Sequence, residues 1–235
     1  MELLDEVLAD KSLKLDVFAY DGNEPTVMEK LLELAKQGRV RILLDDYHNH
    51  TKPDCAEMLF DAAFREIAQN ENDIYRGHYG SQAHSKVFIQ RKKNTASKAV
   101  KVLTGSTNFT TNGLYINANH TIVFNNSDVA QVYADAFDAS FGDDEMAAFR
   151  KSAIASTDYT FNDAALPDMT IRFSPHPAKY VDGFFKKITD KILNAGSDVL
   201  FAVMLDESNS DILAAFHQQV TAEDVFTAGI TDVRN

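Results

Sequence analysis

The sequence predicts an α/β fold, and three features of it carry this prediction. Apolar segments of strand length alternate with segments of helical periodicity over most of the chain. The first 46 residues show the order strand, helix, strand, which favours two parallel strands packed against a helix. A similar pattern of residues returns near residue 196, which indicates a second, incomplete repeat.

The elements of the first half follow from this pattern in order. Residues 13–20 form an apolar run typical of a buried strand, and residues 26–37 form a helix that Gly38 ends. Residues 39–45 form the next strand and residues 56–68 the next helix. After these we expect short extended segments and one helix, at residues 74–78, 84–90, 99–103, 120–124 and about 129–141.

Three regions are expected along the chain. Residues 1–145 form the first repeat, residues 146–168 form a linker rich in Ala, Asp, Ser and Thr, and residues 169–235 begin a truncated second repeat. Within this third region we expect an extended segment, a helix, a strand and a helix, at residues 171–174, 180–194, 199–205 and 211–220. The strand LFAVMLD at residues 200–206 resembles LDVFAYD at residues 15–21, although chance similarity between apolar strands is an alternative explanation.

Composition limits the possible partners. A chain of 235 residues with 45% hydrophobic and 25% charged residues is typical of a folded globular protein. The net charge of −12 argues against broad attraction to nucleic acid or anionic membrane, but leaves room for a local basic pocket. Cys55 is the only cysteine, so an intrachain disulfide is excluded and a reducing, cytoplasmic location is expected. Neither a signal peptide nor a transmembrane segment is predicted, so any contact with lipid would be peripheral.

The candidate catalytic residues lie in two short motifs. In an extended segment, alternation places the side chains of His84 and Lys86 on the same face. The next strand ends before Gly105-Ser106-Thr107-Asn108, where glycine permits a tight turn and the hydroxyl and amide groups offer hydrogen bonds. Such groups suit phosphodiester cleavage, because neutral His84 can attack phosphorus while Lys86, Ser106 and Asn108 stabilise the negative charge that develops. A second histidine must then act as the acid for the leaving alcohol.

Together with residues 109–120 and with Phe173-Ser174-Pro175, these motifs resemble the phospholipase D superfamily, whose pattern is His-x-Lys followed by Gly-Ser-x-Asn. The resemblance implies a mixed β-sheet flanked by helices, built in two similar halves that share one site without metal or cofactor. One histidine of that site is the nucleophile and the other the general acid. His84 takes one of these roles, which the sequence does not settle, and Lys86, Ser106 and Asn108 bind phosphate.

The sequence departs from the family pattern in two ways. Arg91 stands where the family has Asp, and Asn119 stands where an acidic residue orients a histidine, so we expect Asn119 to play a weaker supporting role. The second departure is that neither His176 nor His217 belongs to a further His-x-Lys motif. The site is therefore expected to need either a missing carboxy-terminal half, which we favour, or a second copy of the chain.

The expected function is that of a phosphoric diester hydrolase or transphosphatidylase half that works through a phosphohistidine on a phospholipid or a nucleic acid. One alternative is a noncatalytic phosphate-binding or interaction module of the same fold. Another is a chain that is inactive by itself.

Other clusters in the sequence have competing explanations. The loop at residues 45–50, with Asp54 and Cys55, contains metal-ligand residue types at irregular spacing, and we expect it to contact substrate rather than metal. His78 is expected in a solvated loop. The basic run at residues 91–93 is expected in an exposed hairpin turn rather than on nucleic acid. Phe184, Phe185 and Ile188 are expected on a buried helix face.

Overall fold

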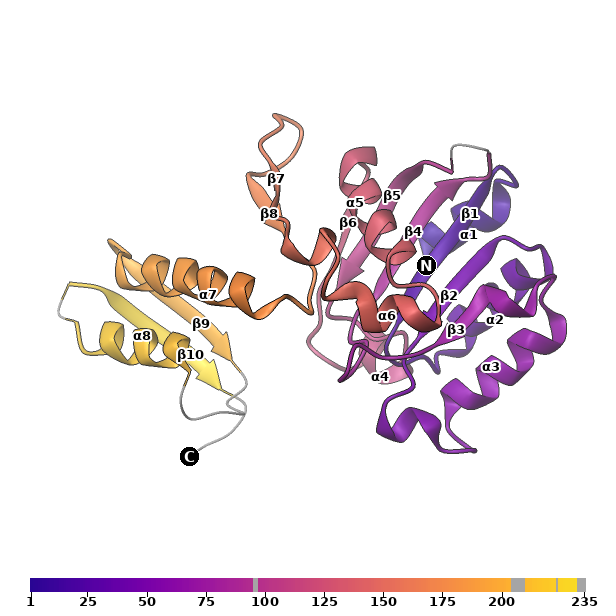
Figure 1. Ribbon diagram of the computed structural model, residues 1–235, viewed down its shortest axis with the longest axis horizontal. Coiled ribbons are helices and arrows are strands. Elements are labelled where there is room, and N and C mark those ends of the chain that lie inside the picture. The colour runs from indigo at the N-terminus through magenta and orange to yellow at the C-terminus, as the bar shows by residue number, and fades with distance from the viewer. Residues whose placement is uncertain (95–96, 204–209, 223, 232–235) are drawn as a thin grey trace. The chain divides into compact units, whose positions relative to one another are not determined.

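A computed structural model of the chain shows two compact units, Met1–Pro175 and His176–Asn235, and describes residues 1–94, 97–203, 210–222 and 224–231 (Figure 1). The first unit contains a six-stranded sheet in the order β3-β2-β1-β4-β5-β6. Its strands are β1 (Leu13–Ala19), β2 (Val40–Leu44), β3 (Ile74–Arg76), β4 (Val87–Lys92), β5 (Ala99–Gly105) and β6 (Thr121–Phe124). Strands β1, β2 and β3 are parallel, and β4, β5 and β6 are antiparallel to their neighbours. The predicted α/β class, with a mixed sheet flanked by helices, is confirmed.

Helices cover both faces of this sheet. They are α1 (Glu2–Ala9), α2 (Pro25–Lys36), α3 (Ala56–Ile67), α4 (Thr111–Tyr115), α5 (Ser127–Asp138) and α6 (Asp143–Phe149). On one face Val17 and Ile42 belong to the same apolar cluster as Leu31 of α2, and on the other Phe18 packs edge-on against Phe137 of α5 with ring centroids 5.1 Å apart. The central strands are therefore apolar on both faces, which explains why they appear in the sequence as continuous apolar runs.

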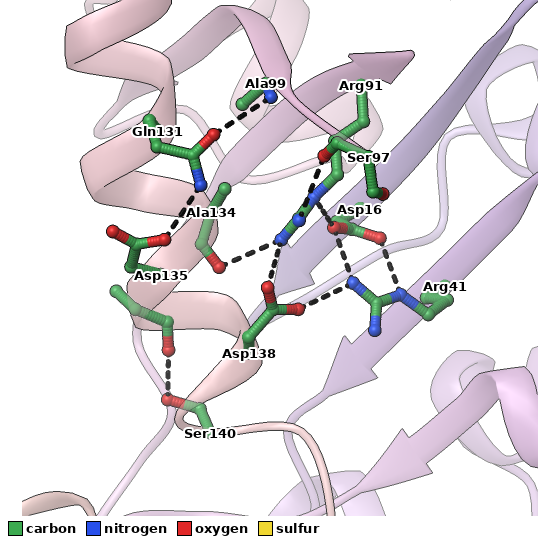
Figure 2. Close-up of polar contacts among 11 residues, drawn as sticks. Asp16, Arg41, Arg91, Ser97, Ala99, Gln131, Ala134, Asp135, Asp138 and Ser140 are labelled. Carbon is green, nitrogen blue, oxygen red and sulfur yellow. Dashed lines mark hydrogen bonds and ion pairs between the residues drawn. The ribbon is translucent and has the colours of Figure 1, made fainter. Parts of the chain in front are cut away.

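A partly buried ion-pair network joins β1, β2 and β4 to α5 (Figure 2). Asp16, which is fully buried, accepts two hydrogen bonds of 2.8 Å from the guanidinium of Arg41. Arg91 Nε and Asp16 Oδ2 form an ion pair at 2.5 Å. This contact is not a hydrogen bond, because the Nε–H of Arg91 does not point at that oxygen. Asp138 of α5 then bridges both arginines at 2.8 Å each. The network holds α5 on the sheet.

This network corrects the expectation that Arg91 lies in an exposed hairpin turn. The side chain of Arg91 is only 4% exposed, while Lys93 is exposed as expected. The reason is the antiparallel register of β1 and β4, which pairs Asp16 with Ile89 and so places Arg91, two residues later, on the same covered face.

The segment that follows the sheet contains more structure than a simple linker. Residues 146–168 include the end of α6, a 3₁₀ turn (Ile154–Ser156) and β7 (Tyr159–Phe161), which pairs with β8 (Met169–Ile171). Two further 3₁₀ turns lie at His48–Thr51 and Glu71–Asp73. No helix among the described residues is long and apolar enough to cross a membrane.

The second unit has the order α7 (Ala178–Leu193), β9 (Asp198–Val203), α8 (Asp211–Val220) and β10 (Phe226–Thr231), and its two strands are parallel. Phe201 of β9 stacks on Phe216 of α8 with ring centroids 4.4 Å apart. Residues 204–206, which belong to the repeat comparison, lie outside the described residues. The buried face expected on α7 is only partly present, because Phe184 and Ile188 are half-buried whereas Phe185 is 42% exposed.

Candidate active site

The two sequence motifs meet at one edge of the sheet in the first unit. Val87, the first residue of β4, pairs with Thr104 of β5, so Lys86 and Ser106 lie just beyond this pair on neighbouring chain segments. Val87 also pairs with Phe18 of β1, so the end of β1 lies on the other side of the same segment. The strand predicted at residues 84–90 begins three residues later, at Val87. His84 and Lys86 therefore lie just before β4 and not within it.

Tyr20, which the sequence reasoning missed, organises the His-x-Lys motif. Its ring packs edge-on against the His84 imidazole with centroids 4.4 Å apart, and Lys86 Nζ lies 4.6 Å from the centre of the same ring. Lys86 Nζ also donates a hydrogen bond of 2.6 Å to the backbone oxygen of His84. A cation over an aromatic face is held by the electrostatic attraction of the ring. The sequence signal that could have identified Tyr20 is its position as an aromatic residue directly after the buried strand β1.

Burial changes the protonation of both motif residues. Lys86 is buried, and desolvation lowers its pKa to about 8 in spite of the nearby Asp21 and Asp45 carboxylates. Desolvation, followed by the charge of Lys86, also lowers the pKa of His84 below its usual value. At neutral pH His84 is therefore mainly the uncharged imidazole that nucleophilic attack requires, while Lys86 keeps most of its positive charge.

The Gly-Ser-x-Asn loop is held against the start of β6. Gly105 has a φ of +157°, and a Cβ placed on it would lie 2.2 Å from the backbone oxygen of His120, so the close approach of the two segments requires glycine. Ser106 Oγ accepts from the backbone N–H of His120 at 3.1 Å and donates to Asn119 Oδ1 at 3.1 Å. Asn119 Nδ2 in turn donates to the backbone oxygen of Gly113 at 2.9 Å. These contacts of Asn119 support the loop that carries Ser106 and Asn108.

Two neighbouring cavities border the candidate residues. His84 and Lys86 line a cavity of about 1170 Å³ together with Arg150, Lys151 and Arg172. Arg172 is paired with Asp158 at 2.8 Å, so Arg150 and Lys151, which are exposed, extend the positive charge of this cavity. An acidic protein therefore contains a locally basic cavity, as a phosphate-handling site requires.

Asn108 lines a second, smaller cavity of about 420 Å³, together with Asp21 and Asn23. Its side-chain oxygen is buried and has no hydrogen-bond partner among the described residues. The backbone N–H of the next residue, Phe109, donates to the backbone oxygen of Asp21 at 3.2 Å, which ties the loop to the end of β1. An unpartnered amide oxygen beside a cavity is a polar group that a ligand can satisfy.

The loop after β2 is anchored to the same edge of the sheet. The sequence predicted that this loop contacts substrate, but not the contacts that anchor it. Asp45 is fully buried, accepts hydrogen bonds from the backbone of Ala83 and Tyr47 at 2.5 and 2.9 Å, and pairs with His50 Nδ1 at 2.7 Å. The His50 ring packs edge-on against Tyr20, 4.7 Å between centroids. Tyr20 is thus contacted by His50 as well as by His84.

His78 is exposed in its loop, as expected. It pairs with Asp46 at 2.6 Å and lines the larger cavity. The structure therefore brings His84, Lys86 and His78 to one cavity and Asn108 to its neighbour, while Ser106 and Asn119 stay exposed beside them.

A mixed α/β sheet that carries His-x-Lys and Gly-Ser-x-Asn at one edge defines a phospholipase D-like domain. A family model described as "Cardiolipin synthase, PLD-like domain" matches residues 7–141, which is more than half of the chain. The chain therefore belongs to the phospholipase D superfamily.

Solved structures show the same fold. Polyphosphate kinase from Porphyromonas gingivalis is 13% identical with a TM-score of 0.63, and phosphatidylserine synthase from Haemophilus influenzae is 10% identical with a TM-score of 0.61. Each alignment covers 97% of this chain, but only 35% of the kinase and 58% of the synthase. Nuc, a phospholipase D family member from Salmonella typhimurium, is 20% identical over 58% of this chain and 83% of its own, with a TM-score of 0.44. No curated protein matches the sequence.

Proposed function

We propose that this chain is the catalytic half of a phosphodiester hydrolase or transphosphatidylase that forms a phosphohistidine at His84. The observation that carries the proposal is the placement of His84 beside the buried Lys86 in a large basic cavity. The lowered pKa of His84 adds to it, because the neutral imidazole is the reactive form.

The reaction has two steps that use the same groups. In the first, an imidazole nitrogen of His84 forms a bond to phosphorus, and the bond from phosphorus to the leaving alcohol breaks as an acid donates a proton to that oxygen. Lys86 and the polar groups of Ser106 and Asn108 stabilise the negative oxygens of the transferred group. In the second step water or another alcohol attacks phosphorus and gives its proton to the conjugate base of that acid, the phosphorus–nitrogen bond breaks, and neutral His84 is restored.

The acid is the group that this site still needs. Beyond residue 120 the sequence contains no further His-x-Lys motif, so we propose that a second half or a second copy of the chain supplies the other histidine. We assign His84 as the nucleophile. The alternative is that His84 is the general acid and the other histidine is the nucleophile. The proposed substrate is a phosphodiester of a phospholipid or of a nucleic acid. We also propose a cytoplasmic location, because a chain with one cysteine forms no intrachain disulfide and does not need an oxidising compartment.

A noncatalytic phosphate-binding module is the second candidate. It is favoured by the replacement of both family carboxylates, since Arg91 takes part in a buried structural network and Asn119 braces a loop. An amide stabilises an imidazolium less than a carboxylate does, which would slow acid or base steps.

Trapping of the intermediate separates the two candidates. The chain, alone and mixed with a candidate second half, is incubated with bis(p-nitrophenyl) phosphate, quenched without acid and measured by intact-protein mass spectrometry. An adduct that maps to His84 supports the enzyme, and an absent adduct in the completed assembly, with phosphate binding retained, supports the module. His217→Asn in α8 is the matched control, because it removes a histidine far from the motif in sequence and should leave the adduct unchanged.

A further inference from the structure

We propose that Asp21, His50 and Glu57 form a binding site for a divalent transition-metal ion such as Zn²⁺ or Mn²⁺. One ligand atom from each of these residues lies within 4.8 Å of the others, and within the described residues they form a group suited to a metal ion. These three residues lie outside the motif of His84 and Lys86, and the proposal does not depend on phosphohistidine chemistry at His84.

The three residues come from different parts of the sequence, and the sheet brings them together. Asp21 follows β1, His50 lies in the 3₁₀ turn after β2, and Glu57 is the second residue of α3. The carboxyl ends of β1 and β2 meet at one edge because these strands are parallel. Ligands at about 2.0–2.2 Å from one ion are at most about 4.4 Å apart. Closing the site therefore requires only a small rotation of the side chains.

The surroundings of the three residues orient them as metal ligands. Asp45 Oδ2 lies 2.7 Å from His50 Nδ1, which leaves the other ring nitrogen, Nε2, for an ion. Histidine ligands of metals are usually oriented in this way by a carboxylate on the opposite nitrogen. Asp45 is itself fully buried and held by two backbone N–H groups, and Arg76 donates to the backbone oxygens of both Asp45 and His50.

Glu57 is fixed from its own side. It is only 4% exposed, and its Oε1 accepts a hydrogen bond of 3.2 Å from the backbone N–H of Gly22. Its carboxylate also shares a hydrogen bond with that of Asp21, which an ion between them would replace. Imidazole with two carboxylates is a ligand set that Zn²⁺ and Mn²⁺ accept.

Charge gives a further reason for an ion at this place. Asp21 and Glu57 place two carboxyl groups side by side in a poorly solvated region, where two uncompensated negative charges are unfavourable. The charge of Lys86 acts on Asp21, but Lys86 Nζ donates to the backbone oxygen of His84 and lies over the Tyr20 ring. Either a cation or a shared proton would balance the pair, and titration with metal distinguishes these two possibilities.

Such an ion would link the two cavities of the candidate active site. Asp21 lines the smaller cavity with Asn108, and His50 contacts Tyr20, on which the His84 ring also packs. Three protein ligands leave a coordination position for water. The ion would then hold the three loops in place.

The test is metal binding by the full chain after treatment with a chelator, measured by isothermal titration with Zn²⁺ and with Mn²⁺. We expect a single ion per chain and a rise in the melting temperature when it binds. His50→Gln and Glu57→Gln should each weaken binding at least about 100-fold, and Asp45→Asn about 10- to 100-fold, as expected for a group behind a ligand. His84→Asn should leave binding unchanged.

The matched controls lie in the same loop. His48→Gln and Asp54→Asn change exposed residues of the same types and should bind metal as the unchanged chain does. Absence of binding by the unchanged chain would overturn the proposal in favour of a shared proton. A loss of metal affinity in the control variants as large as that in His50→Gln and Glu57→Gln would also overturn it, because the exposed residues would then bind the ion. Circular dichroism of each variant establishes that a loss of binding is not a loss of folding, and the Co²⁺ absorption spectrum of the unchanged chain reports ligation independently.

Discussion

The first and second units begin with the same order of elements but bury them differently. The opening of the first, α1-β1-α2-β2, and the whole of the second, α7-β9-α8-β10, each contain a parallel pair of strands joined by a helix. In the first unit the face of β1 turned away from α2 carries Phe18, which packs under α5. In the second unit the face of β9 turned away from α8 carries Leu200, which is 73% exposed.

The difference shows which part of the molecule makes the site. A strand-helix-strand unit forms from local sequence patterns, but its second face is buried only where further elements cover it. In the first unit β4, β5, β6 and α5 do so, and the same strands bring His84, Lys86, Ser106 and Asn108 to the edge of the sheet. The proposed chemistry therefore belongs to the strands added to the parallel pair.

The largest expected effect tests whether chemistry is confined to the first unit. His84→Asn in a completed assembly should lower phosphoryl transfer by about 10³-fold or more, because it removes the proposed nucleophile. His217→Asn in the second unit should change the rate less than about twofold. Release of p-nitrophenol from a diester measures both, and similar losses in the two variants would contradict the assignment.

The ion-pair network of the first unit is expected to be nearly as important for stability. Arg91→Ala should lower the free energy of unfolding by about 3–5 kcal/mol, because Asp16 would remain buried without one of its cations. Arg91→Asp, which restores the residue usual in the family, should be at least as harmful and should not raise activity. Lys93→Ala, at an exposed position two residues later, should stay within about 0.5 kcal/mol. Urea unfolding followed by circular dichroism measures all three, and a neutral Arg91→Ala would show that the network contributes little.

A pair of leucines compares the burial of the two units directly. Leu15 of β1 is fully buried, so Leu15→Ala should cost about 2–5 kcal/mol. Leu200→Ala, on the open face of β9, should cost less than about 0.5 kcal/mol. A large cost at Leu200 in the same unfolding experiment would mean that another surface covers this face in solution.

The smallest expected effect is a pH dependence of anion binding. Lys86 has a pKa of about 8, so it is mainly charged at pH 7 and mainly neutral at pH 9. Sulfate, whose charge is constant in this range, should therefore bind about tenfold more weakly at pH 9 than at pH 7. Lys86→Arg keeps its charge and should remove the dependence. Lys186→Ala in the second unit should leave it as it is, and a flat profile in the unchanged chain would rule out Lys86 as the titrating cation.

The sequence by itself determined the local elements and the identity of the motif. Most helices and strands lie within a few residues of their predicted positions, because apolar periodicity reports which face of a segment is buried. It also determined the family, since His-x-Lys and Gly-Ser-x-Asn are short, local patterns. The initial helix α1 was missed, because alternating acidic and apolar residues gave no clear helical start signal.

Only the tertiary structure decided which distant residues meet. The burial of Arg91 follows from the pairing of β1 with β4, which no local pattern specifies. The contacts of Tyr20 with His50 and His84, and the convergence of Asp21, His50 and Glu57, arise because parallel and antiparallel strands place loops from distant parts of the chain at one edge. Register across a sheet is a long-range property, and for this reason the sequence predicted the residues of the motif but not the groups that surround them.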